Sequence, residues 1–503
     1  MAATRSPATY AALLERVAEI RDLSAAGSLV GWDQEVMMPP AGADSRAHVM
    51  AALASVTHAR TTDRELVRLV GTLDGRRARL SPAQRRGLQL SRRLVDNATR
   101  IPADLARDLA LAESRGLETW RAARAKKDWK RFQPALEHMV GLKRRVARLK
   151  AGKGRLYDAL LDDYEPGATI ATIDPLLDAL RAITVPLVQA VARSGVRIDT
   201  APLVGRFDVA AQRQFSQAVV EAMGIDLSAG RLDLSTHPFC SGIAPRDVRM
   251  TSRFDERDLR GGLFGVIHEA GHGLYEQGLQ PSRARSPLGG AVSMAIHESQ
   301  SRLWENLVGR SRPFWTHWLP KLVALHPQLK GTTVDGLWRA CNLVRPSFIR
   351  VEADELTYNL HNILRYEIER DLIEGRQSVA DLPERWNDGM AAALGIRPRH
   401  DSEGVLQDIH WAMGLFGYFP TYSMGNLYAA QFMEAARAQI RGLDKRIAKG
   451  DLHTLREWLR EKIHRHDQLY TAEQLCRRVT GKLLDTDAFE RHITGKLREV
   501  YGV

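Results

Sequence analysis

Residues 268–272 hold side chains of the types and spacing that bind a metal ion. The segment reads His268-Glu269-Ala270-Gly271-His272, and a second His-Glu pair, His297-Glu298, follows it. Histidines four residues apart lie on one face of a helix, so both imidazoles can reach the same ion. Glu269 projects toward the same place and can take a proton from water, while Glu298 is a candidate third ligand that leaves a fourth position open. The spacing predicts a zinc peptidase.

Two simpler explanations compete with the metal site. By composition alone, a His-Glu-x-x-His segment is expected in on the order of a few per cent of chains of this length. A histidine pair on a solvated helix would also look the same. However, apolar residues flank the motif, at 263–267 before it and at Leu274 and Tyr275 after it, which indicates a buried helix. Buried imidazoles and carboxylates are costly unless they are paired or bind a metal, so the context favours the metal site.

The composition is that of a large globular protein in a reducing compartment. Of 503 residues, 44% are hydrophobic and 26% are charged, which is ample for a large core. The cysteines Cys240, Cys341 and Cys476 are widely spaced and form no Cys-x-x-Cys pair. We therefore expect neither a thiolate metal site nor a disulfide framework.

The sequence contains no clear targeting segment and no clear sign of a polyanionic partner. Its first 30 residues carry charges at regular intervals and lack the apolar core of a secretory signal. No stretch approaches the ~18 consecutive apolar residues of a membrane span. The net charge of +12 is spread along the chain, mostly as arginine, without a basic run interleaved with aromatic residues. We expect a cytoplasmic protein with no membrane partner and no nucleic-acid partner.

Helix signals dominate the chain. Ser81 and Thr471 each precede a glutamine three residues later, which is the capping-box pattern of a helix start. Residues 101–150 are predicted to form two long helices that break near Lys127 and Asp128. No internal repeat, low-complexity segment or long linker divides the sequence. One large, mainly helical body is predicted.

One segment has the period of a strand. From residue 247 to 254, Val248, Met250 and Phe254 alternate with Arg249, Thr251 and Arg253, the pattern of a half-buried strand. The residues before it, 237–242, include a proline and a glycine, which suggests irregular structure or an edge strand. We expect the segment to line a substrate cleft, where an extended peptide adds through backbone hydrogen bonds.

Two later segments extend the candidate site. Residues 349–355 are predicted to be helical, with Arg350, Asp354 and Tyr358 (or His361) on one face. The alternative for Arg350 and Asp354 is a surface ion pair worth a few tenths of a kcal/mol. Residues 410–426 are dense in glycine and aromatic side chains, which is typical of a tightly turned wall, although an aromatic cluster alone is usually core.

These motifs together resemble those of the M32 metallocarboxypeptidases, the thermostable carboxypeptidase type first known from Thermus. The resemblance runs in order along nearly the whole chain. The matching segments are Trp32-Asp33-Gln34-Glu35 with Met38-Pro39, His237-Pro238-Phe239, Asp247 to Thr251, His268 to His272, His297-Glu298-Ser299-x-Ser301, Ile349 to Asp354, and Gly417 to Tyr422 with Gly425-Asn426.

The resemblance implies a mainly α, two-lobed body of the neurolysin/ACE-like gluzincin type, with a deep substrate cleft and a small β-sheet near the metal site. It implies a single domain over residues 1–503, with a metal-binding core at about 235–430. The N-terminal helices (about 1–230) and the C-terminal helices (about 430–503) would form the cleft walls. It also implies a homodimer.

The resemblance further implies one Zn²⁺ per chain on His268, His272 and Glu298, with Co²⁺ able to substitute. Imidazole and carboxylate also suit cobalt and nickel, so the ligand types do not select the ion. The expected reaction is hydrolysis of the C-terminal peptide bond by a metal-activated water, with Glu269 as general base. This is the activity of a metallocarboxypeptidase, EC 3.4.17.

The developing oxyanion needs a donor besides the metal. Tyr422 is the first candidate, followed by Tyr418 and His410, because similar metallopeptidases place such groups on the wall that faces the metal. The alternatives are that Tyr418 is simply packed and that His410 only supports another group.

A carboxypeptidase must also bind a free carboxylate, which suits the planar fork of arginine. Family resemblance favours Arg350 and Arg249, and the strand alternation adds Arg253. For each, the alternative is a structural ion pair with a neighbouring aspartate. His237 and Tyr418 are the other candidate substrate contacts. No pocket for one kind of side chain is recognisable, so broad specificity is expected, with proline poorly accepted beside the scissile bond.

Two other functions remain alternatives. A helical zinc oligoendopeptidase shares the metal motif but cuts internally, and the segments around Arg249 and Arg350 favour the carboxypeptidase over it. A catalytically silent scaffold could retain the motif, but the intact Glu269 argues against this.

Overall fold

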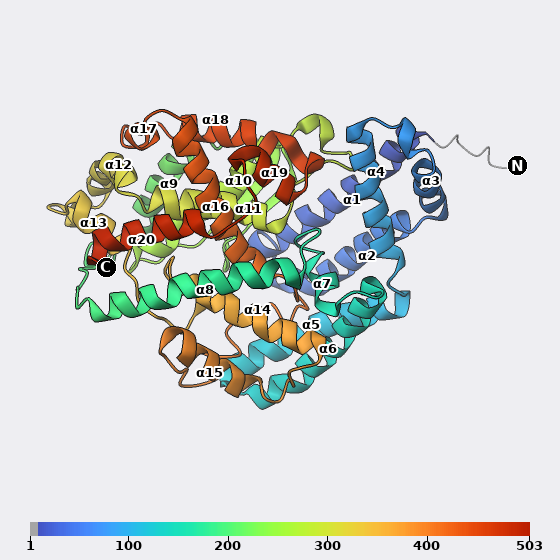
Figure 1. Cartoon of the computed structure of the whole chain (residues 1–503), viewed down its shortest axis with the longest axis horizontal. Coiled ribbons are helices and arrows are strands. Elements are labelled where there is room, and N and C mark those ends of the chain that lie inside the picture. The colour runs from blue at the N-terminus through green and yellow to red at the C-terminus, as the bar shows by residue number, and fades with distance from the viewer. Residues whose placement is uncertain (1–8) are drawn as a thin grey trace, which may run out of the picture.

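The computed structural model describes residues 9–503, and helices make up most of it (Figure 1). In chain order the elements are α1 (Tyr10–Val36), α2 (Ala43–Thr61), α3 (Arg64–Asp74), α4 (Pro82–Thr99), α5 (Ala103–Lys126), α6 (Trp129–Ala151), α7 (Leu156–Leu161), α8 (Ile170–Arg193), α9 (Val209–Met223), β1 (Gly230–Leu234), β2 (Cys240–Ala244), β3 (Asp247–Ser252), α10 (Leu259–Gly278), α11 (Met294–Arg302), α12 (Arg312–Leu325), α13 (Val334–Cys341), α14 (Tyr358–Glu374), α15 (Leu382–Leu394), α16 (Phe419–Gln439), α17 (Leu443–Ile447), α18 (His453–Lys462), α19 (Ala472–Thr480) and α20 (Asp487–Tyr501). The predicted mainly α fold with a small sheet is confirmed.

The predicted helix boundaries follow from local chemistry. Ser81 and Thr471 both form complete capping boxes at the starts of α4 and α19, which satisfies backbone N–H groups that have no partner within the helix. The predicted break near residue 127 is also confirmed. Lys127 takes a left-handed conformation with φ of 56° and ends α5, and the Asp128 side chain accepts a hydrogen bond from the backbone N–H of Arg131 to begin α6.

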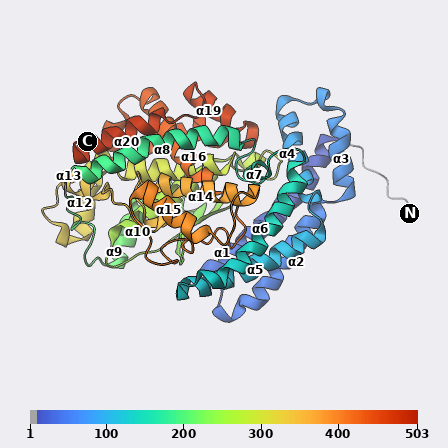
Figure 2. The ribbon, with the colours of Figure 1, turned by 60° about the horizontal axis from the view of Figure 1, so that its bottom comes forward.

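The hydrophobic residues form two cores. A small one joins α1, α3 and α4 through side chains such as Leu13, Leu69 and Leu88, and a large one runs through the rest of the molecule. Figure 2 shows α1 to α6 gathered on one side and the later helices on the other. The domain boundaries expected within this body stay predictions.

Helix α8 is the one helix within residues 9–503 that is long and apolar enough to cross a membrane by composition. Its buried residues recur at helical spacing, as at Ile173, Leu177 and Leu180, and the helix contacts α14, α15 and α20. This one-sided pattern is that of a helix packed on a protein core.

The sheet corrects the expectation that an extended peptide adds to the alternating segment 247–254 through backbone hydrogen bonds. Its strand order is β1-β3-β2, with β3 parallel to β1 and antiparallel to β2. The alternating segment therefore forms the central strand, and the sheet edges belong to β1 and β2. Val248 and Met250 are buried as expected, but Thr251 and Ser252 are buried as well, because β3 is covered by its neighbours and by α10. Local periodicity describes the faces of a strand and not its pairing partners.

The segment around Arg350 corrects the prediction of a helix at residues 349–355. Only a single 3₁₀ turn, Arg350–Glu352, forms there, and α14 begins at Tyr358. The Asp354 carboxylate accepts hydrogen bonds from the backbone N–H groups of Leu356 and Thr357. Such local side-chain-to-backbone bonds compete with helix formation. Arg350 and Asp354 therefore do not share a helical face.

Candidate metal centre and active site

Helix α10 carries the His-Glu-x-x-His segment through the protein interior. The Asp258 side chain caps its first turn, and α10 packs against β3, α9 and α11. Gly271, inside the motif, allows the close approach of α11, because a Cβ atom there would lie 2.6 Å from the Cα of Ser301. The glycine therefore brings α11, with its glutamate, against the histidine face of α10.

His268, His272 and Glu298 converge as the sequence predicts. Their candidate ligand atoms all lie within 4.8 Å of one another. The Nε2 atoms of His268 and His272 lie 3.7 and 3.4 Å from Oε2 of Glu298, and the two rings are nearly perpendicular, with centroids 5.0 Å apart. Three ligands of these types converging on one point suit a divalent ion such as Zn²⁺ with a fourth position open.

The outward nitrogens of both imidazoles are already engaged. Nδ1 of His268 lies 2.9 Å from Oε2 of Glu305, and Nδ1 of His272 lies 2.5 Å from Nδ1 of His297. His297 in turn places its Nε2 2.8 Å from Oε1 of Glu276. Histidines that bind metals usually donate their other ring N–H to such a group, which sets the tautomer. The donor set therefore fits a metal ion on the Nε2 side.

Positive charge surrounds the ligand carboxylate. Arg302, one turn after Glu298, donates from Nε to Oε1 of Glu298 at 2.7 Å and also pairs with Glu305. Its guanidinium lies over the ring of Tyr358, 4.1 Å from the centroid. Burial alone would raise the pKa of Glu298, but Arg302 and His268 hold it well below its usual value. Glu298 is thus ionised, with Oε2 left facing the histidines.

Glu269 lies at the same centre without a competing partner. The residue is 6% exposed, and within the described residues it makes no ion pair or side-chain hydrogen bond. Burial raises its pKa to about 7, and the charge of Glu298 adds to this, while His268 opposes it. A buried carboxylate with a pKa near neutrality is suited to accept and return a proton.

The aromatic segment 417–422 faces the ligand carboxylate. The Cβ atom of a residue replacing Gly425 would meet the Glu298 side chain at 2.6 Å, so α16 lies directly against it. Burial, and then the charge of Glu298, raise the pKa of Tyr418. His410 Nε2 lies 3.2 Å from the hydroxyl of Tyr422. The structure thus brings Tyr418, Tyr422 and His410 together on the side of the metal ligands.

A buried glutamate anchors this wall. Glu369 on α14 accepts hydrogen bonds from the hydroxyl of Tyr157, from Nε1 of Trp411 and from the backbone N–H of Gly417. Gly417 has a φ of 93° and packs against the backbone of Leu160, so this turn has no room for a side chain. Burial raises the pKa of Glu369 to about 8.

Arg350 is buried and paired with a residue that the sequence did not indicate. Its Nε and Nη2 donate to Oδ1 of Asp408 at 3.1 and 2.9 Å, and Nη1 donates to the hydroxyl of Tyr358 at 2.9 Å. The guanidinium also lies 4.9 Å from the ring centroid of Tyr422. Three of its five N–H donors are thereby used. Arg350 therefore contacts the aromatic wall at Tyr422, and Asp408 holds its guanidinium in place.

The other substrate candidates lie on or beside the sheet. Arg249 pairs with Asp247 and lies over the ring of Trp32, 4.5 Å from its centroid. Arg253 is exposed and reaches only the backbone oxygen of Thr236, at 3.5 Å. His237 is exposed. Among residues 9–503, none of these three forms a hydrogen bond or ion pair with the metal-ligand residues.

Sequence reasoning missed the residues that hold the ligands. Arg302 and Glu305 follow Glu298 by four and seven residues, which is one helical face, so this signal was available. The next segment, Leu303–Gly309, is π-helical. Glu276 is likewise four residues after His272 on α10. Asp408 carries no local signal, because it pairs with Arg350 across 58 residues of sequence.

The chain is similar to known proteins along nearly its whole length. The model of the family described as carboxypeptidase Taq (M32) metallopeptidase matches residues 12–497. Thermostable carboxypeptidase 1 of Thermus thermophilus is 41% identical, over 98% of this chain and 99% of that protein. Carboxypeptidase 1 of Bacillus subtilis is 36% identical, over 97% of each chain.

The chain is also similar to solved structures along nearly its whole length. The crystal structure of M32 carboxypeptidase from Deinococcus radiodurans superposes with a TM-score of 0.95 at 39% identity, over 98% of this chain and 99% of that one. Metallocarboxypeptidase 1 of Trypanosoma cruzi gives a TM-score of 0.94 at 34% identity, with the same coverage. With a full-length family match and relatives well above 30% identity, this chain belongs to the M32 family of metallocarboxypeptidases.

Proposed function

We propose that this carboxypeptidase is zinc-dependent, that His268, His272 and Glu298 bind one Zn²⁺ per chain, and that it removes C-terminal residues of many kinds from peptides. The observation that carries the proposal is the convergence of three ligand atoms within 4.8 Å, with both outward imidazole nitrogens already engaged. Co²⁺ is proposed as a functional substitute, because the same ligand types suit it.

The metal, when bound, would polarise the scissile carbonyl and lower the pKa of water. Glu269 then accepts the proton of the attacking water and delivers it to the leaving amine, which its raised pKa supports. Arg302 keeps Glu298 ionised, and Glu305 and His297 orient the two imidazoles. These are positioning roles, because none of the three has to touch the substrate.

We assign the oxyanion donor to Tyr422, with His410 behind it. His410 is neutral, because burial and Arg350 lower its pKa to about 3. It therefore supports Tyr422 through a hydrogen bond and not through charge. We keep Arg350 as the first candidate for the substrate carboxylate, with Arg249, Arg253, His237 and Tyr418 as further substrate contacts. The location of Arg350 beside Tyr422 supports this order.

A pair of peptides tests the proposal. Both carry a blocked N-terminus, and they differ only in a free or amidated C-terminus. Metal-loaded enzyme should shorten the free-acid peptide one residue at a time, as read by mass spectrometry, and should leave most of the amidated peptide intact. Internal fragments from both peptides would contradict it. A peptide series that varies the last residue tests the breadth of specificity, with proline expected to resist.

We further propose that the enzyme is a homodimer, as the family resemblance implies, and that it is cytoplasmic without nucleic-acid or membrane partners, as its N-terminal residues and its dispersed charge suggest. Light scattering at several protein concentrations measures the oligomeric state directly.

A further inference from the structure

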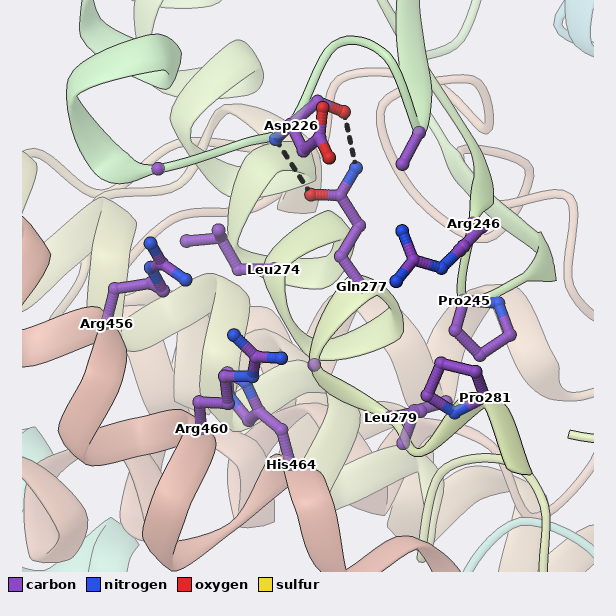
Figure 3. Close-up of a pocket in the computed structure, with 13 residues that line it drawn as sticks. Asp226, Pro245, Arg246, Leu274, Gln277, Leu279, Pro281, Arg456, Arg460 and His464 are labelled. Atoms are coloured by element: carbon purple, nitrogen blue, oxygen red, sulfur yellow. Dashed lines mark hydrogen bonds between the residues drawn. The ribbon is translucent and has the colours of Figure 1, made fainter. Parts of the chain in front are cut away.

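A cavity lies beside the C-terminal end of α10, beyond the histidine motif. It has a volume of about 300 Å³, and its polar lining comes from Asp226, Arg246, Gln277, Arg456, Arg460 and His464 (Figure 3). Gln277 is five residues beyond His272, which corresponds to about 7.5 Å along a helix. None of these side chains is part of the proposed catalytic site.

The lining is rich in positive charge. Arg456 and Arg460 lie one turn apart on α18, and Arg246 comes from the turn between β2 and β3. Figure 3 shows the guanidinium groups of Arg456 and Arg460 on one side of the pocket and that of Arg246 on the other. Three lining guanidinium groups face one lining carboxylate, Asp226. The pocket therefore carries a net positive charge.

The acidic neighbours offset only part of this charge. Asp226 already accepts hydrogen bonds from the backbone N–H and the hydroxyl of Ser228, at 2.9 and 2.6 Å. Glu457 lies 2.6 Å from Arg456 but 3.9 Å from Arg460. Within residues 9–503, Arg246 has no ion pair. Arg246 and Arg460 thus have guanidinium donors free for a ligand.

Two buried polar atoms in the lining also lack partners, namely Nε of Arg456 and Nδ1 of His464. His464 is fully buried, and burial together with Arg460 lowers its pKa to about 3, so the ring is neutral. Its Nε2 lies 2.9 Å from Oε1 of Gln300. Because that amide oxygen can only accept, Nε2 carries the ring proton, and Nδ1 is an unpaired acceptor enclosed against Gly278. Buried polar atoms without partners are uncommon and costly.

We propose that this pocket binds a phosphate group, either as inorganic phosphate or as the phosphate of a small monoester. Guanidinium groups match phosphate oxygens in bidentate fashion. The site is separate from the metal centre, but His464 joins it to α11 through Gln300, two residues after Glu298.

Calorimetric titration of the full-length, metal-loaded enzyme tests the proposal. Inorganic phosphate should bind at one saturable site per chain in addition to any binding at the metal. Arg246→Gln and Arg460→Gln should each weaken this site about tenfold or more, since a hydrogen bond to a charged group is worth about 1.5 to 3 kcal/mol. Arg193→Gln, an exposed arginine on α8, is the control and should bind as the wild type does.

Repeating the titration on metal-free protein separates the two binding places, because the pocket should still bind phosphate there. A simple sugar phosphate used as a second ligand distinguishes a monoester site from one that accepts only the free ion. The proposal is overturned if no saturable binding survives metal removal or if both arginine variants bind like the wild type. None of these titrations depends on peptidase activity, so their outcome is independent of the proposed function.

Discussion

The Nδ1 atoms of His272 and His297 lie 2.5 Å apart, so a single proton must be shared between two imidazoles that would otherwise repel. His297 directs its other nitrogen to Glu276 at 2.8 Å. If that nitrogen carries a proton, His272 must donate from Nδ1, which leaves its Nε2 bare and facing Glu298. The chain Glu276, His297, His272 thereby presets a metal-binding tautomer.

Replacing His297 with alanine should therefore weaken metal binding by about 10- to 100-fold, the usual effect of losing a partner that orients a ligand. Competition with a chromophoric chelator measures the dissociation constant. His453→Ala, at an exposed histidine on α18, is the control and should bind metal normally. An unchanged dissociation constant in the His297 variant would remove its positioning role.

Replacing Glu269 with glutamine should abolish most turnover while metal content and thermal stability are retained. A general base contributes about 10²- to 10⁴-fold, and the amide is nearly the same size but cannot accept the proton. Stopped assays on one peptide, with metal analysis of the same sample, provide the measurement. Glu352→Gln, at an exposed glutamate, should retain full activity. Near-normal turnover of Glu269→Gln would assign the proton transfer elsewhere.

Replacing Arg350 with alanine should reduce kcat/KM for free-acid peptides by about tenfold or more, and far more than for amidated peptides, because only the former offer a carboxylate. The variant also leaves Asp408 with Arg365 as its remaining arginine partner. Equal losses on both substrates would assign Arg350 to positioning Tyr358 and Tyr422 instead. Arg253→Ala, assayed on the same pair, tests the weaker candidate.

The convergence of the candidate metal ligands was predictable because helical spacing is a local property. His268, His272 and Glu298 each lie on a helix whose period could be read from the sequence, and apolar flanks indicated burial. The partner of Arg350 was not predictable, because Asp408 reaches it only through tertiary packing. Likewise, alternation in residues 247–254 indicated a strand but not its central position, since strand order depends on residues far away in the sequence.

The raised pKa of Glu369 predicts a pH-dependent stability. Burial sets its native pKa at about 8, above the value of about 4.3 for an unfolded glutamate. The native state therefore holds a proton that the unfolded state releases. The contribution of the protonated Glu369 to stability is complete below about pH 4 and is lost as the pH rises toward 8. The neighbouring titratable groups are Tyr157 and Tyr164, which stay neutral in this range.

Urea unfolding between pH 5 and 8 measures this effect. Glu369→Gln should make the free energy of unfolding fall less steeply with pH than in the wild type, even if the variant is less stable throughout. Glu384→Gln, at an exposed glutamate on α15, should keep the wild-type slope. A Glu369→Gln slope equal to that of the wild type would show that this carboxyl group does not hold a proton in the folded state.

Metal dependence of C-terminal trimming tests the central claim most directly. The purified enzyme is dialysed against a strong chelator until metal analysis finds less than about one-hundredth of an ion per chain, and a blocked free-acid peptide is then followed by mass spectrometry. Trimming should stop and should return when one equivalent of Zn²⁺ is added, with Co²⁺ also restoring it. Undiminished trimming by the metal-free protein would contradict a catalytic role for the ion held by His268, His272 and Glu298.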